Sequence, residues 1–124
     1  RDAIKKMFSA FEKNLFPKKV IAIAGTATTL ACMKMGLKEF EENKVDKCII
    51  SIQDMRNIIG ELISLTATEI LAKFGPVMNG REDIILAGAI ILQQFVENFS
   101  IENIIVSTRG IRYGAIVKYL ERSI

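Results

Sequence analysis

The sequence predicts an α/β fold in which a few parallel strands are flanked by helices. Two short apolar runs, residues 20–24 and 104–107, have the β-branched composition of strands. Each run is followed by a polar loop that contains glycine and then by a helical pattern. This order is typical of parallel sheets, whose strands are buried on both faces. The 124 residues, half of them hydrophobic, fit a single globular domain.

The first predicted element is an amphipathic helix from about Asp2 to Phe16. Its apolar side chains recur at helical spacing: Ile4, Met7, Phe8, Phe11 and Leu15. Pro17 ends the pattern, because proline cannot continue a helix interior. The chain enters this helix at once, without an initiator methionine, so we expect a fragment of a longer protein.

The central prediction is the turn after the first strand. Val20 to Ala24 should form a buried strand, Gly25 should turn the backbone, and the next helix should run to Met35 and end at Gly36. The threonines of this turn are candidate caps of the helix and candidate phosphate ligands: Thr26, Thr28 and Thr29. A helix N-terminus offers free N–H groups and a positive dipole end to an anion. The alternative is an ordinary turn whose threonines only cap.

The middle of the chain reads as a short edge strand at residues 48–50 and then a series of helices. Ser51 and Thr66 each open a capping-box pattern, which places helix starts at both positions. Gly75 and Pro76 stop the second of these helices.

A long apolar helix is predicted from Glu82 to Asn98, and it must be buried over most of its surface. Gly88 within it is expected to allow close packing against a neighbouring backbone.

The last unit repeats the logic of the first. After the strand at residues 104–107 comes a loop with two arginines, Arg109 and Arg112, and then a helix at residues 115–120. Ligands bind at the carboxyl ends of strands in open α/β sheets, and a guanidinium matches phosphate oxygens. Both arginines are therefore candidate phosphate ligands, and the alternative is a solvated loop with a surface ion pair.

Composition excludes several kinds of function. The net charge of +3 is modest and its basic residues are scattered, which argues against nucleic acid as a partner. The chain has no histidine, and Cys32 and Cys48 form no metal or redox motif, so no metal site is predicted. Cys32 is expected to be a buried, reduced thiol. No apolar run is long enough to cross a membrane and no signal peptide is visible, so a cytoplasmic protein without a membrane partner is expected.

Three segments together resemble a known family in order and spacing. They are residues 25–31 (GTATTLA), 79–88 (NGREDIILAG) and 105–114 (IVSTRGIRYG). In these segments the chain resembles, over about its whole length, the exopolyphosphatase and guanosine pentaphosphate phosphohydrolase (Ppx/GppA) phosphatases.

The resemblance implies a fold and a set of roles. Family members have two ribonuclease-H-like domains of the actin, Hsp70 and sugar-kinase superfamily, and residues 1–124 would be the C-terminal part of the second. Gly25 to Thr29 would match the nucleotide-facing turn. Arg109 and Arg112 would match the strand-end arginine region, with Arg112 the better candidate to face the ligand. Arg81 would have a structural role, pairing with Glu82, Asp83 or a helix end.

The resemblance also implies what this chain lacks. The acidic, glycine-rich phosphate loop of the family is absent, as is the N-terminal half with its catalytic glutamate. No catalytic residue is therefore predicted here, and the chain should be inactive alone. Mg²⁺ is expected for the parent enzyme but no cofactor for this part. The Gly110 to Gly114 segment has Tyr113 where many members have glutamate, so substrate preference stays open.

Three functions follow as hypotheses. The chain is one wall of the cleft of a hydrolase that releases terminal phosphate from polyphosphate or guanosine pentaphosphate, completed by the missing N-terminal half. Alternatively it is a regulatory domain that binds a nucleotide or guanosine tetraphosphate (ppGpp), or a dimerisation and packing module. Because so few strands leave an exposed edge, a homodimer is expected.

Overall fold

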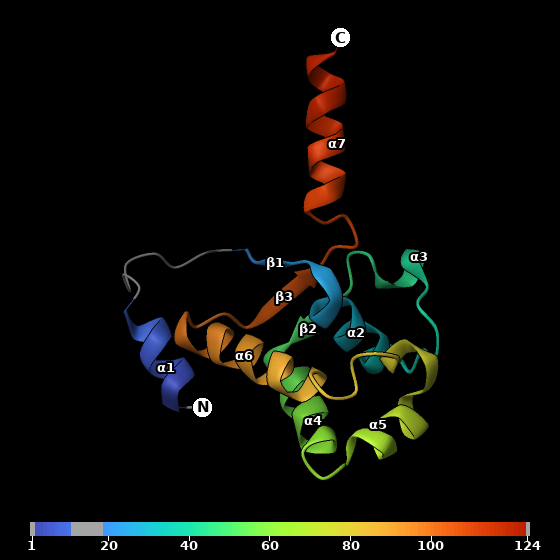
Figure 1. The fold of residues 1–124 in the computed structure, drawn as a ribbon. Coiled ribbons are helices and arrows are strands. Elements are labelled where there is room, and N and C mark those ends of the chain that lie inside the picture. Colours follow the sequence, from blue (N-terminus) through green and yellow to red (C-terminus); the bar gives the residue numbers. More distant parts are fainter. Residues whose placement is uncertain (1, 11–18, 124) are drawn as a thin grey trace.

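The computed structural model describes residues 2–10 and 19–123 as helices around a small sheet, which confirms the α/β class (Figure 1). The elements in chain order are α1 (Asp2–Ser9), β1 (Ile21–Ala22), α2 (Ala24–Met35), α3 (Glu42–Val45), β2 (Ile49–Ser51), α4 (Ile52–Leu62), α5 (Ala67–Phe74), the 3-10 helix η1 (Gly75–Met78), α6 (Ile85–Asn98), β3 (Asn103–Val106) and α7 (Ile111–Arg122).

The sheet has the strand order β1-β3-β2. β1 and β3 are parallel, as predicted, with Ile21 opposite Ile105. β2 lies at the edge, as predicted for the short strand, but it runs antiparallel to β3 with Ile50 opposite Ile104. The sheet is therefore mixed and not parallel throughout as predicted, because β2 runs against the direction of β3.

The prediction of strands buried on both faces is wrong. Helices α2 and α4 pack against one face, where Ile50, Ile104 and Val106 are fully buried. On the opposite face Ile21 is 58% exposed and Ile49 52% exposed. The described helices cover only one face of the sheet. An apolar run in the sequence therefore predicts a strand, but it does not predict whether one or both faces of that strand are buried.

The turn after β1 also differs from its prediction. The strand is shorter than residues 20–24, and α2 begins at Ala24, so Gly25 already lies in the helix. The left-handed residue that makes the turn is Ala24, with φ of 73°. The other end of α2 agrees with the prediction: Gly36 has φ of 69° and its N–H donates to Cys32 and Met33 carbonyls.

Other boundaries shift by a few residues. α1 ends at Ser9, and the rest of the predicted helix as far as Phe16 falls on residues 11–18, outside those described. α6 begins at Ile85 instead of Glu82. α7 begins at Ile111 instead of residue 115, so Arg112 lies in a helix and not in a loop.

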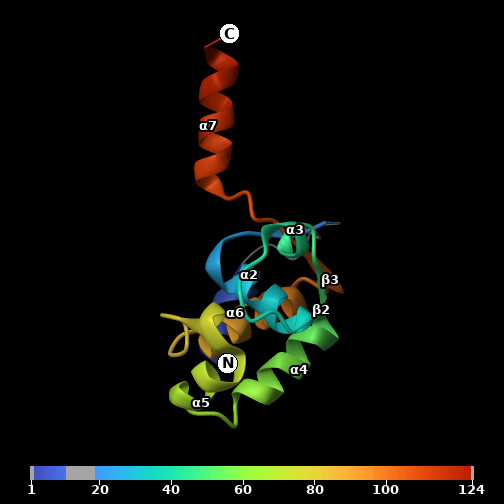
Figure 2. The same ribbon diagram turned by 90° about the vertical axis from the view of Figure 1, so that its right-hand side faces the viewer.

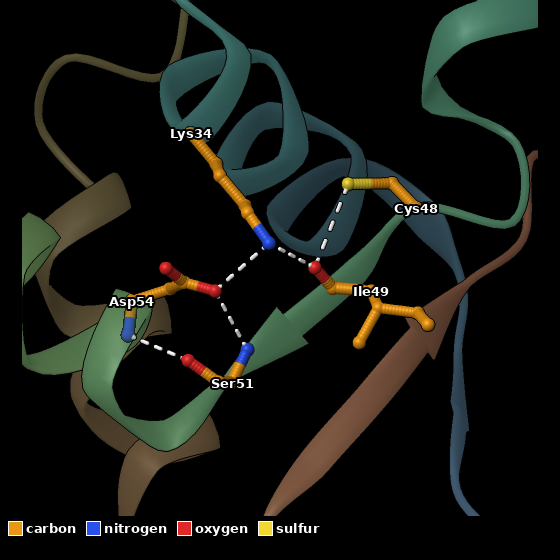
Figure 3. Close-up of polar contacts among 5 residues, drawn as sticks. All are labelled: Lys34, Cys48, Ile49, Ser51 and Asp54. Atoms are coloured by element: carbon orange, nitrogen blue, oxygen red, sulfur yellow. Dashed lines mark hydrogen bonds and ion pairs between the residues drawn. The ribbon is translucent and has the colours of Figure 1, made fainter.

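Both predicted capping boxes are confirmed. The Ser51 hydroxyl accepts from Asp54 N at 3.0 Å, and Thr66 does the same for Glu69 N at 3.2 Å. Figure 3 shows how the first box joins three elements: Lys34 of α2 donates to the Ile49 carbonyl of β2 and pairs with Asp54 of α4 at 3.0 Å. These polar contacts fix α2 against the β2–α4 connection, over a core that includes Met55.

Two helices differ sharply in their environment. α6 packs against α4, α2 and α1, with Ile85, Ala89 and Val96 buried, although the exposed Ile91 shows that one side is uncovered. α7 has no buried residue and projects away from the other elements in both views (Figures 1 and 2). The body of the fold therefore ends at β3.

Candidate functional site

The carboxyl ends of the two parallel strands lie side by side, as predicted. Ala22 is paired with Val106, and the Ser107 N–H donates to the Ala22 carbonyl at 2.9 Å. The turn at residues 23–25 and the loop at residues 107–110 therefore leave the same edge of the sheet. This edge is where ligands bind in α/β folds.

The N-terminus of α2 at this edge has no side-chain cap. Its N-cap residue is Ile23, which has no hydrogen-bonding side chain. The predicted threonine caps are wrong: the Thr28 hydroxyl donates backwards to the carbonyls of Ala24 and Gly25, at 3.2 and 3.1 Å. The first-turn N–H groups of α2 thus remain without a side-chain acceptor, and the positive end of the helix dipole is uncompensated there.

The guanidinium of Arg81 lies against this same turn. A β-carbon on residue 25 would overlap the Arg81 side chain, so glycine is what allows the close approach. Arg81, Thr28 and the buried Thr29 line one hollow of about 470 Å³. The sequence indicated no ligand role for Arg81; the glycine at position 25 was the available signal, and it was assigned to a backbone turn.

Arg81 also lacks the carboxylate partner that was predicted for it. The ion pairs among residues 2–10 and 19–123 involve Lys34, Lys44, Arg56 and Lys73. One carboxylate oxygen of the neighbouring Glu82 is buried without a hydrogen-bond partner among the described residues. The Arg81 guanidinium and the positive end of α2 are thus in contact, and the exposed Glu39 lines the same hollow.

Thr26 contacts α6 and does not line the hollow that Thr28, Thr29 and Arg81 share. A β-carbon on Gly88 of α6 would meet its Oγ1 at 2.8 Å and its Cγ2 at 2.9 Å. The predicted close packing at Gly88 is confirmed, although the neighbour is a side chain and not a backbone. Thr26 also lines a second, mainly apolar hollow with Phe8 and Phe95.

The two arginines after β3 are separated by the start of α7. Arg109 lies in the loop, its N–H donates to Ser107 Oγ at 3.2 Å, and its guanidinium is 5.1 Å from the Tyr113 ring centre. Arg112 is exposed in the first turn of α7. The structure thus places Arg109 at the sheet edge and Arg112 on the projecting helix.

The structure adds a carboxylate to this edge, from the residues that precede β2. Asp46 Oδ1 accepts from Thr108 N at 3.0 Å and lies 3.2 Å from the Thr108 hydroxyl. The hydrogen bond from the Thr108 backbone lowers the pKa of Asp46 against the effect of burial, and the Thr108 hydroxyl, Arg109 and Lys47 lower it further. Asp46 is therefore ionised beside Arg109.

The two cysteines differ in burial and both are free thiols. Cys32 is fully buried, as predicted, and burial raises the pKa of its thiol. Within the described ranges there is no group of three or more cysteine, aspartate or glutamate side chains that could hold a metal ion. In the same ranges no helix is both long and apolar enough to cross a membrane.

Comparison with known proteins decides the family. The model of the Ppx/GppA phosphatase family matches residues 1–123, nearly the whole chain. The chain belongs to the Ppx/GppA phosphatase family. None of the curated protein sequences compared with it matches.

Solved Ppx/GppA structures share the fold. A crystal structure of the Aquifex aeolicus family member matches with a TM-score of 0.89 and 24% identity, over 98% of this chain and 39% of that one. Its type II variant matches with a TM-score of 0.88 and 24% identity, over 94% and 38%. A crystal structure of an exopolyphosphatase-like protein has a TM-score of 0.81 and 22% identity, over 99% and 43%. The predicted actin-like, ribonuclease-H-like fold is confirmed, and the chain spans about two fifths of the length of these Ppx/GppA structures.

Proposed function

We propose that the chain forms one wall of the substrate cleft of a Ppx/GppA hydrolase. The longer protein would release terminal phosphate from inorganic polyphosphate or from guanosine pentaphosphate. The observation that carries the proposal is the Arg81 guanidinium against the uncapped first turn of α2. Two positive groups in contact repel each other, and a phosphate between or beside them would relieve the repulsion.

Each residue of this site has a definite task in the proposal. Backbone N–H groups at Gly25 and Thr26 donate to phosphate oxygens, and Arg81 supplies a planar cation that matches two of them. Thr28 and Thr29 shape the wall of the hollow they share with Arg81. Arg109, at the end of the neighbouring strand, binds the next phosphate group of a chain-like substrate, and Arg112 contacts a more distant part of the ligand.

The chemical step belongs to residues outside this chain in the proposal. Hydrolysis of a phosphoanhydride needs a group that orients water and a cation that neutralises developing charge. In the part of the chain that the structure describes no three carboxylates gather, and in the proposal one or two carboxylates of the N-terminal half hold Mg²⁺ together with the substrate phosphates. Mg²⁺ and the catalytic base would therefore come with the N-terminal half, and the chain alone would be inactive. A cytoplasmic location remains a prediction.

Self-association is a second, independent proposal. The outward face of the sheet exposes Ile21 and Ile49, and α7 exposes Ile111, Ile116 and Tyr119. Apolar groups in such numbers on one molecule favour burial against another surface. We expect copies of the chain to form a homodimer when no longer chain covers these groups.

Isothermal titration with inorganic tripolyphosphate and with guanosine tetraphosphate tests the anion site. The wild-type chain should bind, and Arg81→Gln should weaken binding about tenfold or more, since a hydrogen bond to a charged group contributes about 1.5–3 kcal/mol. Arg56→Gln is the matched control, because Arg56 pairs with Glu97 away from this edge. Equal losses in both variants would mean attraction by net charge alone and would refute the site.

A further inference from the structure

Thr108 is held by a carboxylate from a distant part of the chain. Its backbone N–H donates to Asp46 Oδ1 at 3.0 Å, across 62 positions of sequence. Its hydroxyl lies 3.2 Å from that same oxygen and 3.2 Å from Glu42 Oε1. The hydroxyl has a single proton and can donate it to only one of the two carboxylates at a time. The backbone N–H donates to Asp46 alone, so this bond is the one that fixes the loop.

The strand pairing places Asp46 at this position. β2 runs antiparallel to β3, so the residues before β2 lie opposite the residues after β3. Lys47 N donates to the Val106 carbonyl at 2.7 Å, and Val106 N donates to the Cys48 carbonyl at 2.8 Å. Lys47 has a left-handed backbone with φ of 67°, which ends the ladder and turns the chain at Asp46.

Arg109 directly follows Thr108 in the chain, so the position of Arg109 depends on where Thr108 is fixed. Arg109 lines a hollow of about 400 Å³ with Lys19, Lys47 and Asp46. Few other contacts fix it: a bond from its N–H to Ser107 Oγ, and the Tyr113 ring on the exposed α7. The contact of Asp46 with Thr108 is thus a main link between Arg109 and the body of the fold.

We propose that Asp46 is a positioning residue that orients the Arg109 loop for phosphate binding. This inference rests on the proposed function, because it concerns the same edge of the sheet. Asp46 itself does not contact the substrate. Its hydrogen bonds set the direction in which Thr108 and Arg109 leave β3.

The direction of the change in phosphate affinity distinguishes the positioning role of Asp46 from the effect of its charge. Asp46 is an anion beside an anion site, so loss of its charge alone should strengthen phosphate binding. Loss of its hydrogen bond to Thr108 should weaken binding by releasing Arg109. Asp46→Ala removes both the charge and the bond, whereas Asp46→Asn removes the charge and keeps an oxygen that accepts from Thr108 N.

The test is isothermal titration of the full chain with inorganic tripolyphosphate. Asp46→Ala should lower the affinity about threefold or more, and Asp46→Asn should raise it about two- to fivefold, the range expected for one exposed charge pair. Glu42→Ala is the matched control: it removes a nearby charge, leaves the Asp46–Thr108 bond, and should not weaken binding. In an Arg109→Ala background, Asp46→Ala should cause no further loss.

The failures of the two proposals can be told apart. If Asp46→Ala binds more tightly than wild type while Arg81→Gln still loses binding, the positioning role is overturned and the proposed site stands. If Asp46→Ala unfolds, Thr108→Pro replaces it, because it removes the N–H that donates to Asp46 and keeps the Asp46 charge. Weaker binding by Thr108→Pro supports the inference, and unchanged or tighter binding overturns it. No binding by any variant, wild type included, would overturn both proposals.

Discussion

The guanidinium of Arg81 lies against the backbone of Gly25, where any β-carbon would overlap it. The two residues come from different elements: Gly25 lies in the first turn of α2, and Arg81 precedes α6. Their contact gives the N-terminus of α2 a cation instead of the usual acceptor cap. The proposed phosphate site depends on this arrangement, and several consequences can be measured.

Substitution of Gly25 should separate binding from stability. Gly25 does not have a left-handed backbone, so Gly25→Ala fits the helix and should leave stability unchanged or up to about 1 kcal/mol higher. The new methyl group must displace Arg81, and tripolyphosphate affinity should fall severalfold. Thermal unfolding and titration of the same samples would measure both effects.

The matched control for that variant is Gly60→Ala. Gly60 lies in α4 with open space where a β-carbon would be placed. It should gain similar stability without any change in binding. A Gly25→Ala variant that binds as well as Gly60→Ala would show that Arg81 does not act from its position over residue 25.

Substitution of Gly88, unlike that of Gly25, should lower stability, because Gly88 packs against Thr26. Gly88→Ala puts a methyl group within 3 Å of the Thr26 side chain, so α2 and α6 must separate. We expect a loss of about 1–3 kcal/mol in the free energy of unfolding, as for other overpacked cores. Urea unfolding would measure it. The double variant Gly88→Ala/Thr26→Ala should recover most of the loss, and a simple sum of two losses would contradict this explanation.

Features with local signals could be predicted from the sequence. The capping boxes at Ser51 and Thr66 act over three residues, and the helices begin where those patterns place them. Gly36 ends α2 for a similarly local reason, since it takes the left-handed conformation. The family resemblance in three short segments predicted the ribonuclease-H-like fold, which no local pattern predicts by itself.

The site itself depended on contacts that no local pattern encodes. Threonine can bond to the carbonyls of the preceding turn as readily as it caps, and Thr28 does so. The approach of Arg81 to Gly25 and of Asp46 to Thr108 joins elements far apart in sequence. The sequence also could not show that only one face of the sheet is buried. Ile21 and Ile50 are both isoleucines in apolar runs, yet Ile21 is exposed and Ile50 is buried.

Stability should fall in acid because of Asp54. Burial raises its pKa, but bonds from Ser51 and Lys34 outweigh this effect, so its pKa lies below the ordinary 3.8. The contribution of its ionised form is therefore present above about pH 3.8 and is lost as the pH falls through the lower, folded-state value. Urea unfolding of wild type at pH 6 and at lower pH would show the decline.

Asp54→Asn should reduce that decline and lower stability at neutral pH by about 1 kcal/mol. Asp83→Asn is a suitable comparison, since Asp83 is exposed and its side chain has no hydrogen bond to any of the described residues. An Asp54→Asn chain with the full acid sensitivity of wild type would mean that other carboxylates cause the loss.

Removal of α7 should affect association more than folding. The helix buries none of its residues, so a chain ending at Gly110 should unfold within about 1 kcal/mol of the full chain. It also exposes fewer apolar groups and should form fewer dimers at micromolar concentration. Light scattering would compare the two chains. A monomeric 124-residue chain would contradict the proposed self-association.

The uncapped first turn of α2, beside Arg81, is the proposed phosphate site. The most direct measurement is the change in backbone amide NMR shifts when inorganic tripolyphosphate is added to the ¹⁵N-labelled chain. The largest changes should occur at the amides of Gly25, Thr26 and Ala27, saturate with ligand, and disappear in Arg81→Gln. Changes spread over the exposed lysines, with none at residues 25–27, would contradict it.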